Sequence, residues 1–437
     1  MIKIIAIIVL TLIFFVSCDS PEADPPAKTK SVEDNYFIGR VTRPGRPEIS
    51  FDMDYSMFFG DNNTYNHDIA LASSVIAATY LRSAFFENLG LSDIVTLPIG
   101  LVDTDRAELL MGNRAVKYND RTLTIVKVYV RDNNGSFEEM FSNLDIGADT
   151  AEYIALTSSA HSEWTNRYNF KGIDITANRA VPTIKEYVSS IESESPTVLW
   201  ISGFGRGAAI ANIIGTYFEN DPDVIPFTYT FAAPNTTTSP EAQLYRTIFN
   251  IINTDDMTTL IPPAAWGFTR FGQDMAVSVA GHGQEAFKEL TGIIYTYHTN
   301  SDIALNSLIG IAPTRESLYV INNNFFTVSE EFADLASAEV YKRRLESSLR
   351  PQLRDLAKFH VDETSDGGYR IILYQTPAFF VHALPETMTW SRDFSITLAE
   401  QFLWPRYFLI TAYFESALGP PHQPITYYLI VRDFPEN

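Results

Sequence analysis

Hydrophobic and polar positions follow two different periods along the first 275 residues of the chain. Residues 121–132, RTLTIVKVYVRD, divide into two alternating sets of side chains, which predicts a strand. Residues 65–86 carry apolar side chains three and four positions apart, which predicts a helix, and the same spacing predicts a second helix over 181–195.

The central part of the chain repeats strand and helix in turn. Residues 197–202, TVLWIS, form the continuous apolar run expected of a strand buried on both faces. A helical pattern follows over 208–220, and two further strand patterns cover 226–234 and 245–256. This order predicts an α/β fold with a mostly parallel sheet, right-handed crossovers and flanking helices.

The pattern changes beyond residue 275. Residues 329–359 are charged and amphipathic with helical spacing, whereas residues 369–384 have a strand-like pattern. We therefore expect an α/β core over 36–275, a long and mainly helical insertion or cap over 276–415, and a return to the core over 416–437.

The first residues have the pattern of a secretory signal. An apolar run extends from Ile4 to Val16 behind a single lysine, and a helix of that length reaches only about 20 Å, too short for a bilayer. Ser17 followed by Cys18 resembles a bacterial lipobox, in which the cysteine receives the lipid. The polar residues 18–35 then form a flexible tether.

This resemblance implies a lipoprotein with residues 1–17 removed as its signal peptide. The lipid on Cys18 would make a membrane the partner and place the protein in a bacterial cell envelope, in the periplasm or on the outer surface. The alternative is an ordinary cleaved signal with an incidental cysteine.

Composition narrows the range of partners. The 437 residues are 46% hydrophobic, as in a globular protein, and carry a formal net charge of −21. So negative a chain repels phosphate backbones, which argues against nucleic acid as a partner. The only cysteine, Cys18, excludes an intramolecular disulfide. No H-x-x-x-H or H-E-x-x-H spacing occurs, so we expect no metal, and we expect no cofactor.

A glycine-spaced turn joins the strand at 197–202 to the following helix. A nucleophile elbow has the pattern G-x-S-x-G because its backbone is strained and its helix packs close to the strand. Gly203 and Gly207 stand at the two flanking positions, but the centre is Gly205. The turn therefore has the form of an elbow without a side chain at the nucleophile position.

The sequence LWISGFGRGAAIANIIG at 199–215 resembles the elbow of class 3 (fungal-type) lipases, which is usually written G-H-S-L-G-G-A. Phe204 takes the position of the histidine, Gly205 that of the serine and Arg206 that of the leucine. The resemblance implies an α/β-hydrolase fold and a family of lipid-ester hydrolases.

Three further segments resemble that family in the expected order. NIINTDDMTTLIPP resembles the segment of the catalytic aspartate, with Asp256 at the matching position and Asp255 as a near-register alternative. GPPHQPITYYL near the end resembles the histidine segment and points to His422. Upstream, Ser158 and Ser159 stand roughly where the family has its oxyanion-loop Arg-Gly-Thr.

Glycine at position 205 conflicts with ester hydrolysis by an acyl-enzyme. Loss of the nucleophile from a comparable hydrolase costs a factor on the order of 10⁶ in turnover. We therefore expect a catalytically impaired lipase-like protein that retains a site for lipid or ester ligands. An active esterase that uses another serine, either Ser202 or one of Ser158 and Ser159, is the first alternative.

The second alternative is dinucleotide binding, because GFGRGA also satisfies G-x-G-x-x-A between a strand and a helix. Against it, the strand after the turn ends in FAAP without a carboxylate, and Glu219 comes too early. Two residues have simpler interpretations as well. Asp256 fits a helix N-cap, and Arg206 either binds an anion beside the glycine amides or faces solvent or a carboxylate.

Overall fold

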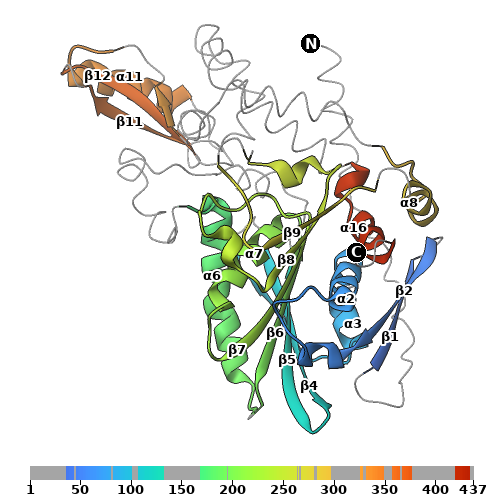
Figure 1. Cartoon of the computed structure of the whole chain (residues 1–437). Coiled ribbons are helices and arrows are strands. Elements are labelled where there is room, and N and C mark those ends of the chain that lie inside the picture. The colour runs from blue at the N-terminus through green and yellow to red at the C-terminus, as the bar shows by residue number, and fades with distance from the viewer. Residues whose placement is uncertain are drawn as a thin grey trace.

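The computed structural model describes most of the first 296 residues and five shorter parts of the remainder (Figure 1). The described residues are 36–43, 46–79, 82–100, 107–131, 168–193, 195–262, 264, 267–279, 283–296, 325–327, 331–348, 357–364, 367–375 and 419–433. Cys18 and the expected signal and tether lie outside them. Within these ranges, no helix is both long and apolar enough to cross a membrane.

A seven-stranded sheet forms the centre of the molecule, and its strands lie side by side in chain order from β3 to β9. The strands are β3 (Ser92–Pro98), β4 (Glu108–Tyr118), β5 (Arg121–Arg131), β6 (Thr197–Phe204), β7 (Val224–Phe231), β8 (Ile248–Asn253) and β9 (Gln273–Val277). The pairs β3–β4 and β4–β5 are antiparallel, and the four pairs from β5 to β9 are parallel. With helices on both faces (Figure 1), this mostly parallel sheet is an α/β-hydrolase-like fold, as the sequence predicts.

The predicted strands β5 and β6 are confirmed, and both are buried on their two faces. In β5, Val126, Val128 and Val130 enter one hydrophobic core, and Ile125 and Tyr129 enter the other. Successive side chains of a strand point to opposite faces, so a strand between two helical layers needs apolar residues at nearly every position.

Helices cover each face of the sheet (Figure 1). On one face lie α6 (Lys171–Ser190) and α7 (Arg206–Phe218), which follows the elbow directly. On the other lie α2 (His67–Ala78), α3 (Arg82–Asn88) and the C-terminal α16 (Pro424–Asp433). The predicted helices at 65–86, 181–195 and 208–220 correspond to α2 with α3, to the second half of α6 and to most of α7.

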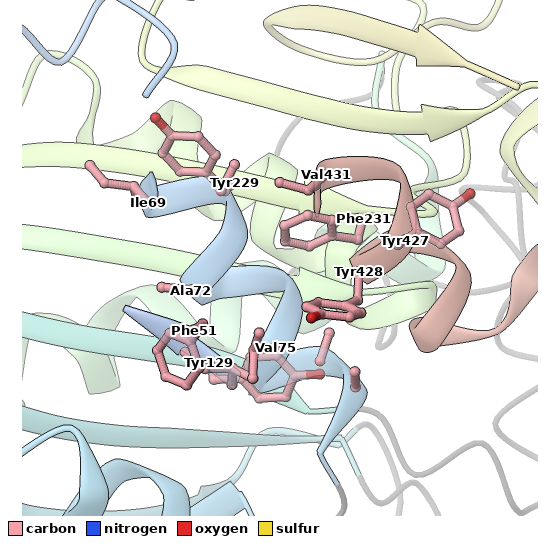
Figure 2. Close-up of a cluster of buried hydrophobic side chains, with 14 of the residues drawn as sticks. Phe51, Ile69, Ala72, Val75, Tyr129, Tyr229, Phe231, Tyr427, Tyr428 and Val431 are labelled. Atoms are coloured by element: carbon pink, nitrogen blue, oxygen red, sulfur yellow. The ribbon is translucent and has the colours of Figure 1, made fainter. Parts of the chain in front are cut away.

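Helix α16 packs against α2 although some 350 residues of sequence separate them. Figure 2 shows α2, with Ile69, Ala72 and Val75, and α16, with Tyr428 and Val431, next to each other over one face of the sheet. This apolar contact positions the end of the chain, including the residues just before α16, at the edge of the sheet where β6 ends.

Two small units complete the described chain. Near the N-terminus, β1 (Tyr36–Arg43) and β2 (Arg46–Asp54) form an antiparallel hairpin, which leads into the 3-10 helix η1 (Tyr55–Phe59). The helix α8 (Gln284–Thr291) belongs to neither unit and follows β9, the last strand of the main sheet, along the chain.

The second unit is a three-stranded antiparallel sheet of β10 (Phe325–Thr327), β12 (Tyr369–Gln375) and β11 (Ala357–Glu363), accompanied by α11 (Leu335–Ser348). We expected a mainly helical 276–415, with a strand only after 369. The described part of that range instead combines helices with this sheet, because β11 finds its hydrogen-bonding partner in β12. The rest of the range lies outside the described residues.

Candidate active site at the β6–α7 turn

The turn between β6 and α7 has the backbone of a strained elbow. Gly205 stands between the last strand residue and the first helical residue with φ 57° and ψ −123°. Side chains other than hydrogen are strained in this region, at a cost of about 1–3 kcal/mol. Its N–H donates to the Phe231 carbonyl at 2.9 Å, which ties the turn to the end of β7.

The flanking glycines are required by the close approach of helix to strand. A Cβ added to Gly203 would lie 2.4 Å from the Gly207 carbonyl oxygen and 2.8 Å from the Ala208 nitrogen. No side chain fits at such distances. The small residues predicted for an elbow are therefore explained by packing.

Asp256 reaches the turn from the loop after β8. It is the N-cap of the 3-10 helix η3 (Met257–Leu260), and its Oδ1 accepts from the Thr258 N–H at 3.0 Å. Its other oxygen, Oδ2, lies 2.8 Å from Nδ1 of His422. The sequence left a cap and a triad position as alternatives for Asp256, and the carboxylate occupies both positions at once.

His422 comes from the 3-10 helix η6 (Pro420–His422), immediately before α16. The imidazole and the carboxylate of Asp256 are both buried, with 3% and 1% of the residue exposed. The structure thus brings together two residues that are 166 positions apart in the sequence.

The hydrogen bonds around the pair assign the imidazole tautomer. An ionised carboxylate only accepts, so the proton of the Nδ1–Oδ2 contact belongs to Nδ1. The Thr258 hydroxyl lies 2.6 Å from Oδ1 of Asp256 and 2.6 Å from the same Nδ1. It therefore donates to the carboxylate, and Nε2 of His422 keeps its lone pair.

That Nε2 faces the centre of the elbow. A Cβ placed on Gly205 would lie 3.3 Å from Nε2 and 3.6 Å from Cε1 of His422. The ring of Phe204 packs against the imidazole, with the two centroids 5.0 Å apart. Elbow, histidine and aspartate therefore have the relative placement of a Ser-His-Asp triad in which the first position has no side chain.

Tyr427 is a further contact of the aspartate, and the sequence did not indicate it. Its hydroxyl donates to Oδ2 of Asp256 at 2.7 Å and accepts from the Asn253 N–H at 3.3 Å. Burial, and then the charge of Asp256, raise the pKa of this hydroxyl well above 10.0, so it remains a donor. In Figure 2 the hydroxyl points away from the apolar cluster. Its position five residues after His422 was the available signal.

Asn253 holds the backbone next to His422 in place through a hydrogen bond. Its side-chain amide donates to the Pro421 carbonyl at 3.0 Å, next to His422, and to the Tyr295 hydroxyl at 3.1 Å. Asp255, the near-register alternative, accepts from Tyr295 at 3.1 Å and from Ser278 at 3.3 Å. Among these described contacts, Asp256 is the carboxylate that holds the imidazole.

Arg206 does not face solvent. Its side chain is 1% exposed and donates to the Thr176 hydroxyl of α6 at 3.5 Å. Its backbone N–H begins α7, at the position that supplies one oxyanion-hole donor in an elbow. Ser158 and Ser159, the expected oxyanion-loop residues, lie outside the described residues.

Ser202 lies inside the core. It is fully buried, and its hydroxyl accepts a hydrogen bond of 2.5 Å from Nζ of Lys127 on the face covered by α2. This arrangement argues against Ser202 as a substitute nucleophile. The dinucleotide alternative is also disfavoured, because the imidazole of His422 stands against the glycine turn where a pyrophosphate would bind.

Comparison with known proteins agrees with this geometry. Residues 128–266 match the family model Lipase (class 3), a span that contains the elbow and Asp256. This segment of the chain is therefore similar to the class 3 lipase family. No curated protein matches the chain.

Several solved lipases are similar in structure. Lipase II from Rhizopus niveus is 14% identical, with 48% of this chain and 79% of that chain covered and a TM-score of 0.33. The Lip2 lipase from Yarrowia lipolytica is 10% identical, with 48% and 78% covered and a TM-score of 0.32. The native Rhizomucor miehei lipase propeptide complex is 14% identical, with 60% and 80% covered and a TM-score of 0.31.

Proposed function

We propose that this lipase-like protein is impaired in serine acyl transfer and retains a site that binds lipid or ester ligands. One observation carries the proposal: the pair of His422 and Asp256 faces an elbow whose central residue is Gly205. An acyl-enzyme needs an oxygen at that position, and glycine offers none.

The remaining parts of the site support the binding of ester ligands. The imidazole has an acceptor nitrogen at the elbow, and α7 begins there, so that the first N–H groups of the helix lie at the turn. Such donors favour the carbonyl oxygen of an ester. We further propose that a lipid on Cys18 holds this site at a membrane of the bacterial cell envelope, where lipid esters are abundant.

The test of impaired catalysis is a comparison of the wild type with Gly205→Ser on p-nitrophenyl esters of short and long acyl chains. The wild type should stay below a kcat of about 1 s⁻¹, the lower end for ordinary enzymes. The serine variant should gain about 10³- to 10⁶-fold, since removal of a triad nucleophile costs up to about 10⁶.

Gly205→Ala is the matched control for this experiment. It adds the same Cβ, 3.3 Å from Nε2 of His422, without the hydroxyl. It should show no gain. Wild-type turnover at ordinary esterase rates, with acyl bound to a serine, would contradict the proposal and support the use of another serine.

The anchor has its own test. The full chain expressed in a bacterium should incorporate labelled fatty acid and fractionate with membranes, and Cys18→Ser should lose both properties. Labelling that persists in this variant would refute lipidation at Cys18.

A further inference from the structure

The centre of the elbow adjoins the acceptor nitrogen of His422. Among the described residues other than the chain neighbours Phe204 and Arg206, the atoms within 4 Å of a Cβ position on Gly205 are Nε2 and Cε1 of this imidazole, at 3.3 and 3.6 Å. A serine would fill this volume with a methylene and a hydroxyl. With glycine, residue 205 itself fills none of this volume, in which a ligand of about the size of one water molecule would lie against Nε2.

The base at this position is prepared for proton transfer. Nδ1 of His422 donates to Asp256, whose carboxylate also accepts from Thr258 and Tyr427. These three donors orient the carboxylate, and its hydrogen bond to Nδ1 in turn leaves the lone pair on Nε2. A histidine held in this way takes a proton from a hydroxyl within hydrogen-bond reach.

We infer that His422 activates a water molecule at the serine position, so that the protein hydrolyses small activated esters directly, without an acyl-enzyme. This inference rests on the proposed loss of serine acyl transfer. It names the nucleophile and substrate class of the same site.

The reaction balances with water as the second substrate. Nε2 removes one proton from water while the water oxygen forms a bond to the carbonyl carbon of the ester. The tetrahedral oxyanion lies near the N–H of Arg206 at the start of α7. Its collapse breaks the bond to the leaving oxygen, which takes the proton from Nε2 either directly or through solvent. The products are one carboxylic acid and one alcohol.

The limited rate gain from general-base catalysis restricts the expected substrates to reactive esters. General-base catalysis contributes about 10²- to 10⁴-fold, far less than a complete triad. Aryl esters have leaving groups stable enough to depart at this level of assistance. Short acyl chains need no long acyl-binding groove. The expected substrates are therefore small esters such as p-nitrophenyl acetate, whereas triglycerides should not react measurably.

The experiment measures p-nitrophenyl acetate hydrolysis by the wild type, by His422→Gln and by Asp256→Asn. Both substitutions should lower kcat/KM by about 10²-fold, the first by removing the base and the second by placing the proton on Nε2. His360→Gln is the matched control, because this exposed histidine lies on β11, and it should leave the rate unchanged.

Two measurements on the wild type guard against misfolded variants. Mass spectrometry of protein quenched during turnover should find no acetyl group, and the rate should show a normal solvent deuterium isotope effect. A histidine-independent rate, or an acetyl group on His422, would overturn the water mechanism. If the water mechanism fails while Gly205→Ser still gains activity, the proposed function stands. An acetylated serine in the wild type would refute the proposed function itself.

Discussion

Two pairs of polar side chains lie near the end of β6, one in the hydrophobic core and one at the candidate active site. Lys127 and Ser202 combine a base with a hydroxyl at 2.5 Å, inside the core beneath α2. His422 and Asp256 face Gly205, where a base has an elbow but no hydroxyl. The first pair has reactive groups in a flat strand, and the second has the strained turn and helix N-terminus that catalysis uses. A base close to a hydroxyl therefore does not by itself indicate an active site. The conformation of the surrounding backbone must also be considered.

Lys127 shows how burial in the core changes the pKa of a basic side chain. Its amine is fully buried, lies 3.9 Å from the centroid of the Trp200 ring, and donates to Ser202. Burial lowers the pKa of this amine well below 10.5. Burial therefore disfavours the charged form of this amine relative to the unfolded chain.

The largest expected effect separates the two neighbouring aspartates. In the Gly205→Ser background, Asp256→Asn should lower kcat about 10⁴-fold, because an amide in place of the carboxylate favours the wrong imidazole tautomer. Asp255→Asn is the matched change, since Asp255 bonds Ser278 and Tyr295, and it should change kcat only a few-fold. Ester hydrolysis assays check both, and an equal loss from the two variants would refute the assignment of Asp256.

The next effect separates the two glycines of the elbow. Gly203→Ala should destabilise the fold by about 3 kcal/mol or more, because its Cβ would meet backbone atoms at 2.4 Å that cannot move independently. Gly205→Ala should cost about 1–3 kcal/mol, mainly from its backbone conformation, because its Cβ would approach only the His422 ring, at 3.3 Å. Chemical denaturation measures both. A larger cost at Gly205 would show that the packing explanation of the flanking glycine is wrong.

The buried lysine predicts a dependence of stability on pH. Since the folded pKa of Lys127 lies well below the unfolded value near 10.5, the unfolded chain binds one more proton between those two values. The free energy of unfolding should therefore rise with pH in this window, by about 1.4 kcal/mol per pH unit at most.

Lys127→Met should remove that rise, so that the variant gains most over the wild type near neutral pH and least near pH 10. Urea denaturation at pH 7, 8 and 9 measures the slope. Lys117→Met changes an exposed lysine on β4 and should keep the wild-type slope. A slope unaffected by Lys127→Met would mean that the buried amine is charged.

The smallest effect concerns the tyrosine behind the aspartate. Tyr427→Phe removes a hydrogen bond of 2.7 Å to the Asp256 carboxylate and should cost about 1.5–3 kcal/mol of stability, as for bonds to charged groups. In the Gly205→Ser background it should also lower kcat more than it raises KM, because it acts through the orientation of the pair. Tyr428→Phe is the matched change on the same helix. Equal effects of the two variants would leave Tyr427 with a packing role alone.

Local pattern alone determined the region around the elbow. The apolar run of β6, the helical spacing of α7 and the glycines between them are short-range features, so 197–218 could be predicted as strand, turn and helix. The strand β5 could be predicted in the same way, because burial on both faces requires apolar residues at nearly every position. The absence of a nucleophile at position 205 could also be predicted from the sequence, because the spacing of the flanking glycines identifies the centre of an elbow.

Only the tertiary structure decided which residues meet at that centre. The sequence placed Asp256 at the matching position with Asp255 as a near-register alternative, and in the structure Asp256 contacts His422 whereas Asp255 contacts Tyr295. Tyr427 and Asn253 act across contacts between segments more than 160 positions apart, which no local pattern encodes. The sheet at 357–375 was missed in part because a strand such as β11 depends on its hydrogen-bonding partner, whereas a helix forms its hydrogen bonds within itself.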